Sequence, residues 1–327
     1  MNITMRQLKV FQSVARHLSF TRAAAELFLT QPAVSMQVRQ LEDTLGLPLF
    51  EQIGKKIFLT EAGREMVRYS RGISQQIEEI AEVFDQLRGV QRGTLRLSVP
   101  GTANHFVTKL LAEFCQRHAQ ITFNLDIANR KGLLDRLENN EADVVIMGKP
   151  PEEMDLVSDR FMDNPLVVIA QPGDALTKRT PVPLAELMQN SFVVREVGSG
   201  TRSAMERFFA EHGVTLKASM EMASNEAIKQ AVAAGLGLGI VSVHTLELEL
   251  ALQRVAVIDC EAFPIMRHWY IVHRRGKRLS PIAEAFKAFV IGEAARLWPL
   301  GQATAPPAAG ARAARAGTRK RNPSARA

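Results

Sequence analysis

Polar and almost uncharged side chains are predicted to share one face of a short helix near the start of this 327-residue chain. They are Gln31, Ser35, Met36, Gln37, Arg39 and Gln40. Amide and hydroxyl groups form hydrogen bonds with base edges or phosphates, and a methionine side chain suits a thymine methyl group. Farther along, Lys55 and Lys56 lie at a predicted tight turn, where their charges would face a phosphate backbone. Taken singly, each feature also suits an ordinary solvated helix or turn, but their order and spacing favour a DNA-binding surface.

A second group of residues has the chemistry to bind a small anion. The segment Gly198-Ser199-Gly200-Thr201-Arg202 opens a predicted helix directly after a predicted strand. Glycines let backbone N–H groups approach a ligand, hydroxyls donate hydrogen bonds, and a helix N-terminus favours negative charge. Arg202 would add a bidentate donor for phosphate or carboxylate. The other candidates for the cleft lie in turns at strand ends or cap the start of a helix. Such residues are also found in ordinary capped turns that bind no ligand. The full set of effector-binding candidates is Pro100, Thr102, Lys149, Ser199, Thr201, Arg202 and Asn225.

Two short helices and a returning strand must position the DNA-binding side chains. Thr21 is predicted to cap the first helix, and Thr30 the second, with Pro32 in a first turn where a missing N–H costs little. The residues expected to be buried are Ala24, Leu27 and Phe28 in the first helix and Val34, Val38, Leu41 and Leu45 in the second. Gly46 is expected to end the second helix. This order is the outline of a winged helix-turn-helix, which sets one helix into the DNA major groove.

The same stretch resembles the N-terminal domain of LysR-type transcriptional regulators. The resemblance rests on Ser19-Phe20-Thr21, Ala23-Ala24, Gln31 to Ser35, Leu41-Glu42, Leu45-Gly46, Leu49-Phe50, Leu59-Thr60 and Ala62-Gly63. Met36 and Gln52 depart from it, since the family often has arginine at these two positions. The resemblance implies a DNA-binding domain over residues 1–60, with the candidates Thr21, Gln31, Pro32, Ser35, Met36, Arg39, Lys55 and Lys56.

Residues 61–90 are predicted to form one long helix. Its apolar residues recur at heptad spacing and are Met66, Ile73, Ile77, Ile80, Phe84 and Leu87. A single buried helix would show a similar stripe, but the other faces of this segment are charged or polar. We therefore expect a dimerising linker helix, and two DNA-binding domains on a two-fold axis would recognise an inverted repeat.

From Gly93 to Leu297, strand and helix patterns alternate. Strands are expected at 94–99, 121–127, 143–147, 166–170, 192–195, 217–222, 238–242 and 267–273, and helices at 104–118, 132–140, 202–212, 226–234 and 281–297. The rhythm predicts parallel sheets with right-handed crossovers, arranged as two α/β lobes around a hinged cleft. It resembles the LysR-type effector domain, itself similar to two-lobe periplasmic binding proteins, and implies an effector-binding domain over residues 91–300.

Several segments further resemble the CbbR branch, which regulates Calvin-cycle (RuBisCO operon) genes. They are Glu141-Ala142-Asp143, Gly148 to Pro151, Asp163-Asn164-Pro165 and Arg195 to Arg202. This resemblance implies an activator of carbon-fixation genes with a phosphorylated metabolite or NADPH as effector. Its partners would be double-stranded DNA, RNA polymerase and further copies of the chain, in a homodimer or tetramer. The residues alone leave open a carboxylate effector and another metabolic operon.

The net charge of +7 is concentrated in one terminal segment. Residues 1–90 carry a net charge of +1, residues 91–298 a net charge of zero, and residues 299–327 six basic side chains and no acidic one. Residues 301–327, rich in Ala, Pro, Gly and Arg, are predicted to be a disordered basic tail. Its role is either that of a solvated appendage or that of a non-specific DNA contact.

Other classes of protein fit the sequence less well. Cys115 and Cys260 are far apart without metal-ligand spacing, which favours reduced thiols in a cytoplasmic protein. We find no Walker loop, nucleophile elbow or metal motif, so an enzyme is disfavoured and no metal or cofactor is expected. A periplasmic solute-binding protein would explain the two lobes, but it would need a signal peptide and would not carry the N-terminal DNA-binding pattern.

Overall fold

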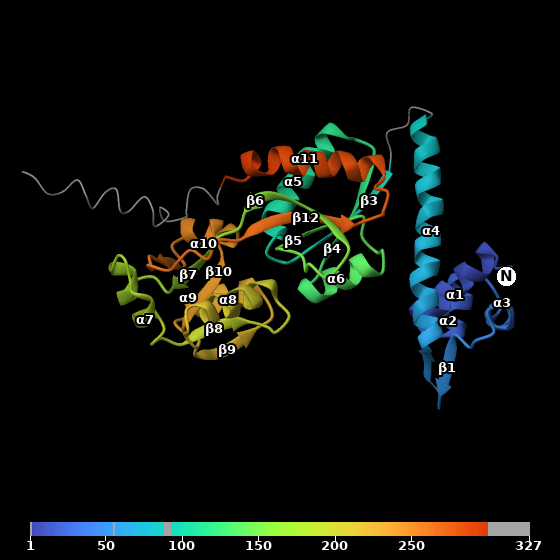
Figure 1. The fold of residues 1–327 in the computed structure, drawn as a ribbon, viewed down its shortest axis with the longest axis horizontal. Coiled ribbons are helices and arrows are strands. Elements are labelled where there is room, and N and C mark those ends of the chain that lie inside the picture. The colour runs from blue at the N-terminus through green and yellow to red at the C-terminus, as the bar shows by residue number, and fades with distance from the viewer. Residues whose placement is uncertain (1, 55, 88–92, 300–327) are drawn as a thin grey trace, which may run out of the picture. The chain divides into compact units, whose positions relative to one another are not determined.

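The computed structural model describes residues 2–54, 56–87 and 93–299. The chain divides into two compact units, one of residues 1–90 with 138–141 and the other of residues 91–137 with 142–327. Each is described by itself (Figure 1). Lys55, the side chain of Leu87 and the predicted basic tail lie outside the described residues.

The N-terminal unit contains a three-helix domain with a two-stranded wing. Its helices are α1 (Met5–His17), α2 (Phe20–Glu26) and α3 (Gln31–Leu45), and its strands are β1 (Phe50–Ile53) and β2 (Lys56–Leu59), which pair antiparallel. The helix α1, which we did not predict, begins with a capping box in which Thr4 accepts from Gln7 N and the Gln7 side chain accepts from Thr4 N. Apolar residues of all three helices form the core.

Two predictions for α2 were wrong. Ser19, not Thr21, is the N-cap, because the Ser19 hydroxyl accepts from Arg22 N at 3.3 Å while Thr21 lies exposed inside the first turn. Phe28 is not buried but 96% exposed, because α2 ends at Glu26 and Phe28 takes the left-handed conformation (φ 54°) in the turn that follows. Ala24 is buried and Leu27 packs against the core, as predicted.

The helix α3 matches its prediction closely. Val34, Val38 and Leu41 are buried, and Leu45 is half-buried. Gly46 is the left-handed C-cap, with φ 72°. Thr30 has the N-cap position, but its hydroxyl makes no capping hydrogen bond, so the predicted side-chain cap is absent. After the wing, the long helix α4 (Glu61–Leu87) begins. A Cβ atom at Gly63 would overlap the carbonyl oxygen of Leu49, so the start of α4 needs glycine to lie against the chain before the wing.

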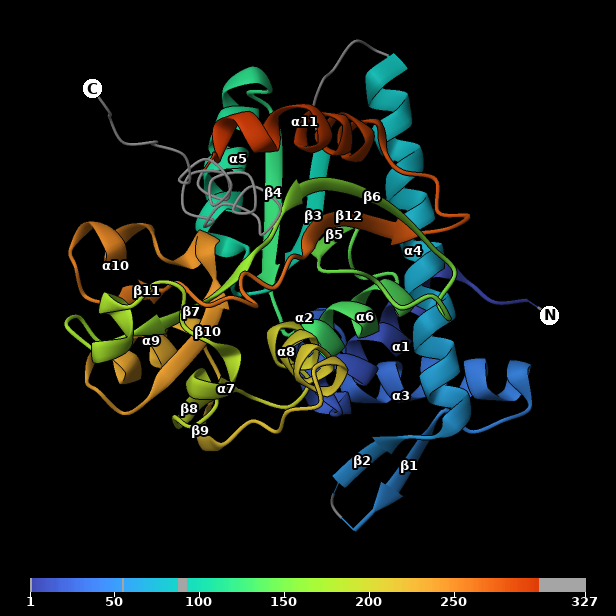
Figure 2. The ribbon, with the colours of Figure 1, turned by 60° about the vertical axis from the view of Figure 1, so that its left-hand side comes forward.

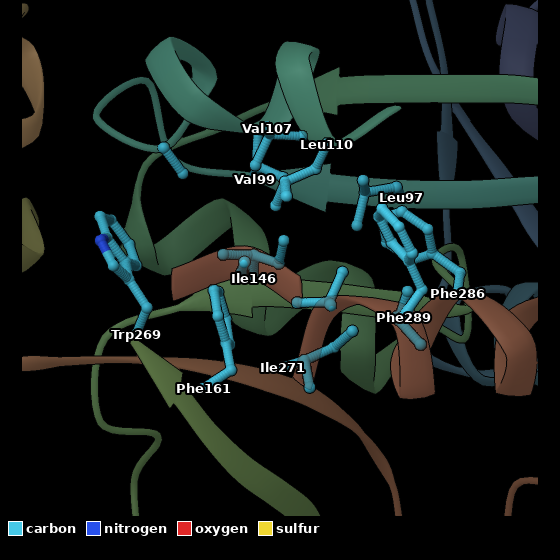
Figure 3. Packing of buried hydrophobic residues seen from close by; sticks show 14 of the residues in the cluster. Leu97, Val99, Val107, Leu110, Ile146, Phe161, Trp269, Ile271, Phe286 and Phe289 are labelled. Atoms are coloured by element: carbon cyan, nitrogen blue, oxygen red, sulfur yellow. The ribbon is translucent and has the colours of Figure 1, made fainter. Parts of the chain in front are cut away.

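Lobe I of the second unit is a five-stranded mixed sheet between helices. In the order β4-β3-β5-β12-β6, its strands are Ile121–Ile127, Gly93–Val99, Val144–Met147, His268–Arg274 and Leu156–Asp163. The helices α5 (Asn104–Arg117) and α11 (Pro281–Leu297) cover one face, and α6 (Arg130–Glu138) covers the other (Figure 2). Alternate residues of β5 and β12 enter the two cores, and the larger core contains Trp269, Phe161 and Phe286 (Figure 3).

Lobe II is a second five-stranded mixed sheet. In the order β11-β7-β10-β8-β9, its strands are Ala256–Ile258, Leu166–Ala170, Leu238–Ser242, Phe192–Arg195 and Ala218–Met222. Its longer helices are α8 (Gly200–Glu211) and α9 (Asn225–Ala233), which pack on opposite faces. The short helices are α7 (Leu184–Leu187) and α10 (Glu247–Ala251), with 3₁₀ turns at Ala175–Lys178 and Val243–Thr245.

The predicted parallel pairing holds for only part of each sheet. The strand β12 runs antiparallel to both β5 and β6, and β7 runs antiparallel to β10 and β11. The strand β6 was not predicted, and β12 enters lobe I only after the chain has passed through lobe II. Strand pairing direction leaves no local signature, so alternating patterns did not reveal it.

The chain crosses between the lobes twice, and the two crossings pair with each other. Asn164 N donates to Arg267 O at 2.7 Å, and Leu166 and Ile265 exchange two backbone hydrogen bonds. Buried His244 reinforces this junction, since its Nε2 donates to Asp163 O at 2.7 Å while its Nδ1 accepts from Trp298 Nε1 at 2.9 Å. Both ring nitrogens are satisfied only by neutral imidazole, in agreement with a pKa that burial lowers.

Candidate functional site

The exposed face of α3 carries the predicted DNA-binding residues. Gln31, Pro32, Met36 and Arg39 are exposed, and Ser35 is half-buried. Gln31 Nε2 donates to Ser35 Oγ at 2.9 Å, so the amide and the hydroxyl are held together before any ligand is present. No side chain caps the N-terminus of α3, which leaves the backbone N–H groups of its first turn accessible to a phosphate.

The remaining DNA-binding candidates lie on two other elements of this unit. Thr21 is exposed in the first turn of α2, and Lys56 is exposed at the start of β2. Lys55, at the wing tip, lies outside the described residues. Gln52, where the family often has arginine, uses its amide to donate to Gly54 O at 2.9 Å and so supports the wing turn.

The heptad stripe of α4 divides into two parts. Met66 is buried in the core of the N-terminal unit, against residues of α1 and α3. Ile73, Ile77, Ile80 and Phe84 are 40 to 56% exposed. The far part of α4 therefore presents an apolar stripe that its own unit does not cover, as a dimerising helix would.

In the second unit, a cavity of about 730 Å³ lies between the lobes. Both lobes and the second crossing contribute to its walls. Six of the seven predicted effector-binding residues line it: Pro100, Thr102, Lys149, Ser199, Thr201 and Asn225. The structure therefore brings these six predicted residues together around one cavity, and their contact with an effector stays a prediction.

Arg202 does not line the cavity. Its Nε donates to Glu206 Oε1 at 2.5 Å and its Nη1 to Arg195 O at 3.2 Å, so it faces β8 instead. The cause is helical periodicity. Gly200, Ser203, Ala204 and Arg207 share the face of α8 that lines the cavity, at helical spacings of three and four residues, and Arg202 lies off this face.

Besides Arg195 of β8, which pairs with Glu196, three arginines line the cavity, and sequence reasoning missed all of them. They are Arg130 in the first turn of α6, Arg207 on α8 and Arg267 on the second crossing. Burial, followed by repulsion from Arg130 and Arg207, lowers the pKa of Arg267 to about 10. Burial and Arg207 also lower the pKa of Arg130. Because these three guanidinium groups lie close together, the cavity has a strongly positive wall.

Thr102 and Asn225 bind each other across the cleft. Asn225 Nδ2 donates to Thr102 Oγ1 at 2.8 Å, and Asn225 Oδ1 accepts from Arg195 Nη1 at 3.0 Å. Arg195 in turn forms a two-point ion pair with Glu196. Asn225 was predicted to cap α9, but the N-cap is Ser224, whose hydroxyl accepts from Ala227 N. In this conformation Asn225 joins the two lobes through this hydrogen bond.

Two other predicted residues, Ser199 and Lys149, form contacts with neighbouring protein groups in the cavity wall. Ser199 is buried and caps α8 by accepting from Thr201 N at 3.2 Å. Lys149 pairs through Nζ with Glu152, which raises its pKa. Burial and Lys229 lower the pKa of His105, which also lines the cavity.

In the part of the chain that the structure describes, no group of His, Cys, Asp or Glu side chains could hold a metal ion, and no helix is long and apolar enough to span a bilayer.

Both units of the chain match known protein families. Residues 5–64 match the "Bacterial regulatory helix-turn-helix protein, lysR family" description, and residues 88–295 match the "LysR substrate binding domain". A RuBisCO operon transcriptional regulator of Allochromatium vinosum is 55% identical over 297 residues, which cover 91% of this chain and 98% of the relative. The transcriptional regulator CbbR of Rhodospirillum rubrum is 43% identical over 88% of this chain and 95% of its own length. These relatives confirm the predicted likeness to the CbbR branch.

Two solved structures place the units among known folds. The regulatory domain of Synechocystis CcmR, solved in complex with 2-PG, is 41% identical with a TM-score of 0.60 over 62% of this chain and 97% of that domain. Full-length CbnR, solved with its target DNA, shares the fold at 20% identity, with a TM-score of 0.66 over 89% of this chain and 99% of CbnR. With both family descriptions matched along most of its length, this chain belongs to the LysR family of bacterial transcriptional regulators.

Proposed function

We propose that this LysR-family protein regulates carbon-fixation genes in response to a phosphorylated metabolite bound between its two effector lobes. The gene class is supported by relatives that are named as RuBisCO operon regulators and align over most of both chains. The ligand class is supported by the cavity itself, whose wall carries Arg130, Arg207 and Arg267 besides Arg195, which pairs with Glu196. That positive wall is the observation that carries the proposal.

The DNA-binding residues of the proposal are those on the exposed faces of the N-terminal unit. Gln31 and Ser35 would contact base edges, Met36 a thymine methyl group, and Arg39 and the wing lysines phosphates. Thr21 and Pro32, in the first turns of α2 and α3, would lie against the DNA backbone. Residues 1–60 would be the DNA-binding domain, 61–90 the linker and 91–300 the effector-binding domain.

The oligomer of the proposal forms through α4. Ile73, Ile77, Ile80 and Phe84 would pack against the same residues of a second copy, and a two-fold axis would then align two DNA-binding domains on an inverted repeat. RNA polymerase would be a further partner in activation. The protein, its DNA and RNA polymerase would all be in the cytoplasm. No catalytic step is assigned to any side chain.

Effector binding would act by shifting a population of lobe arrangements. The ligand stabilises the arrangement in which it contacts both lobes, and the packing of neighbouring effector domains changes with it. The DNA-binding domains then move relative to each other. A carboxylate effector is the second candidate, since arginines also bind carboxylates.

The test is a footprint of the purified protein on the DNA upstream of its own gene and of a divergent neighbour, at fixed salt. We expect protection of an inverted repeat, and a change of the protected region when 2-phosphoglycolate or NADPH is added. Specific binding that ignores both compounds but responds to a carboxylate would replace the phosphorylated effector. Absence of any specific binding would refute the proposed gene class.

A further inference from the structure

Four arginines line the cavity, and apart from Arg195, which pairs with Glu196, they belong to three different parts of the second unit. Arg130 is in the first turn of α6 in lobe I, and Arg207 is on α8 in lobe II. Arg267 lies on the second crossing, where its carbonyl accepts from Asn164 N of the first crossing. One cation therefore belongs to each lobe, and the third belongs to the junction about which the lobes would move.

Two glycines show how closely the lobes approach Arg267. A Cβ atom at Gly148, at the end of β5 in lobe I, would lie 2.9 Å from Arg267 Nη2. A Cβ atom at Gly200, at the start of α8 in lobe II, would lie 3.9 Å from Arg267 Nη2 and 3.9 Å from Arg130 Cδ. Arg267 Nη1 also donates to Gly200 O at 3.2 Å. The guanidinium group of Arg267 thus lies between the two lobes, in a space that side chains at positions 148 and 200 would enter.

Among the described residues, no carboxylate neutralises these three cations. Glu196 and Glu226 line the cavity, but Glu196 pairs with Arg195 at 2.7 Å and Glu226 pairs with Lys229 at 2.7 Å. Arg130 instead donates to Lys149 O at 2.8 Å. Mutual repulsion contributes to the lowered pKa of Arg267 and of Arg130, so the cluster is costly while no anion is present.

We propose that Arg130, Arg207 and Arg267 form a subsite for a phosphoryl dianion, and that the charge of this group is what draws the two lobes together. The inference rests on the proposed function and deepens it, because it assigns the phosphoryl group to named residues. Tetrahedral phosphate presents several oxygens to several guanidinium groups at once, and Arg binds it at two points. A dianion offsets more of the repulsion than a single carboxylate does, so the subsite favours phosphorylated ligands over their unphosphorylated counterparts.

The repulsion has a consequence even without ligand. Replacing Arg207 by glutamine removes one of three like charges and keeps an amide donor of similar reach. We expect Arg207→Gln to raise the melting temperature of the ligand-free protein at low salt, and the gain to shrink as salt screens the charges. The matched control is Arg202→Gln on the same helix, which removes the partner of Glu206 and should not raise the melting temperature.

The main experiment measures binding of 2-phosphoglycolate and of glycolate to the full-length protein by calorimetry. We expect wild type to bind the phosphorylated compound at least about tenfold more tightly. Arg207→Gln and Arg130→Gln should each lower this affinity roughly tenfold and reduce the preference for phosphate, while Arg202→Gln changes neither.

The outcomes separate the two proposals. If wild type binds 2-phosphoglycolate and both variants bind it as well as Arg202→Gln does, the subsite assignment is wrong and the proposed function stands. If wild type binds neither compound nor NADPH, the phosphorylated effector fails, and the subsite fails with it. Should Arg207→Gln lower the melting temperature of the ligand-free protein as much as the control does, the repulsion that underlies the lobe closure is absent.

Discussion

The α3 surface and the inter-lobe cavity are both proposed to contact phosphate, yet they are built differently. On α3 the contacts come mainly from amides and hydroxyls in water, with Arg39 as the one arginine among the candidates. In the cavity, three guanidinium groups gather where burial lowers the pKa of two of them. DNA offers many phosphates and a pattern of base edges, so a solvated polar face is sufficient to read it. A small ligand offers one anionic group, and only concentrated charge in a partly dehydrated site selects it.

The largest expected effect concerns Arg267. Arg267→Gln removes the charge that lies between the lobes, and we expect 2-phosphoglycolate affinity to fall by one to two orders of magnitude, from about 1.5–3 kcal/mol for a charge-assisted hydrogen bond. Operator affinity without effector should stay unchanged. Calorimetry and a gel-shift titration measure the two quantities. A variant that loses operator binding to the same extent would erase the contrast between the two sites.

Next in size is the change at α3. Gln31→Ala removes an exposed amide held by Ser35, and we expect specific operator binding to weaken by about 1–3 kcal/mol with effector affinity intact. Thr44→Ala, also exposed on α3 but nearer its C-terminus, is the control and should bind the operator normally. Competition with non-specific DNA measures the loss. Equal weakening on specific and non-specific DNA would show that Gln31 contacts phosphate and not a base edge.

A smaller effect is expected from a glycine of the cavity. Gly148→Ala puts a methyl group against the flexible end of Arg267, which can move aside, so the fold should tolerate it while effector affinity falls roughly fivefold, about 1 kcal/mol. Gly101→Ala is the control, because it lines the same cavity and its Cβ would meet nothing within 4 Å. Calorimetry measures the effector affinity of both variants. Identical affinities for the two variants would mean that the position of Arg267 is unimportant.

The smallest effect concerns pH and the junction between the lobes. Burial lowers the pKa of His244, so the unfolded chain binds the proton more readily, and stability falls as pH drops below the unfolded value of about 6.5. His105 and His273 have lowered pKa values too and add to the same trend. We expect His244→Gln to flatten the pH dependence of the melting temperature below pH 6.5 by a few degrees. An unchanged slope would assign the trend to the other two histidines.

Sequence reasoning worked best where the relevant contacts are local. The stripe of α3, its Gly46 cap and its exposed polar face all depend on residues a few positions apart, and each was predicted correctly. Failures within the same unit were also local in origin. Ser19 and Thr21 are both competent caps, and only the register of α2 decides between them. Phe28 has an apolar side chain, but a left-handed turn residue after α2 exposes it.

In the second unit, the sequence predicted several turn residues that line the cavity, but not the arginines that meet there. Thr102, Ser199 and Asn225 were predicted because each follows a strand, and all three line the cavity. Arg202 carried the expected anion contact in the prediction, yet its position on α8 turns it toward Glu206. A helix-wheel comparison of Gly200, Ala204 and Arg207 would have pointed to Arg207.

The sequence by itself determined the two units, the family, the Gly46 cap and apolar stripe of α3 and the turns that line the cleft, because helix periodicity and turn chemistry act between near neighbours. Only the tertiary structure decided that β12 returns from lobe II to run antiparallel inside lobe I. That insertion brings Arg267 beside Arg130 and Arg207, which come from segments far apart in the chain. Charge repulsion and desolvation depend on distance in space, and no local pattern records which distant residues the fold will bring together.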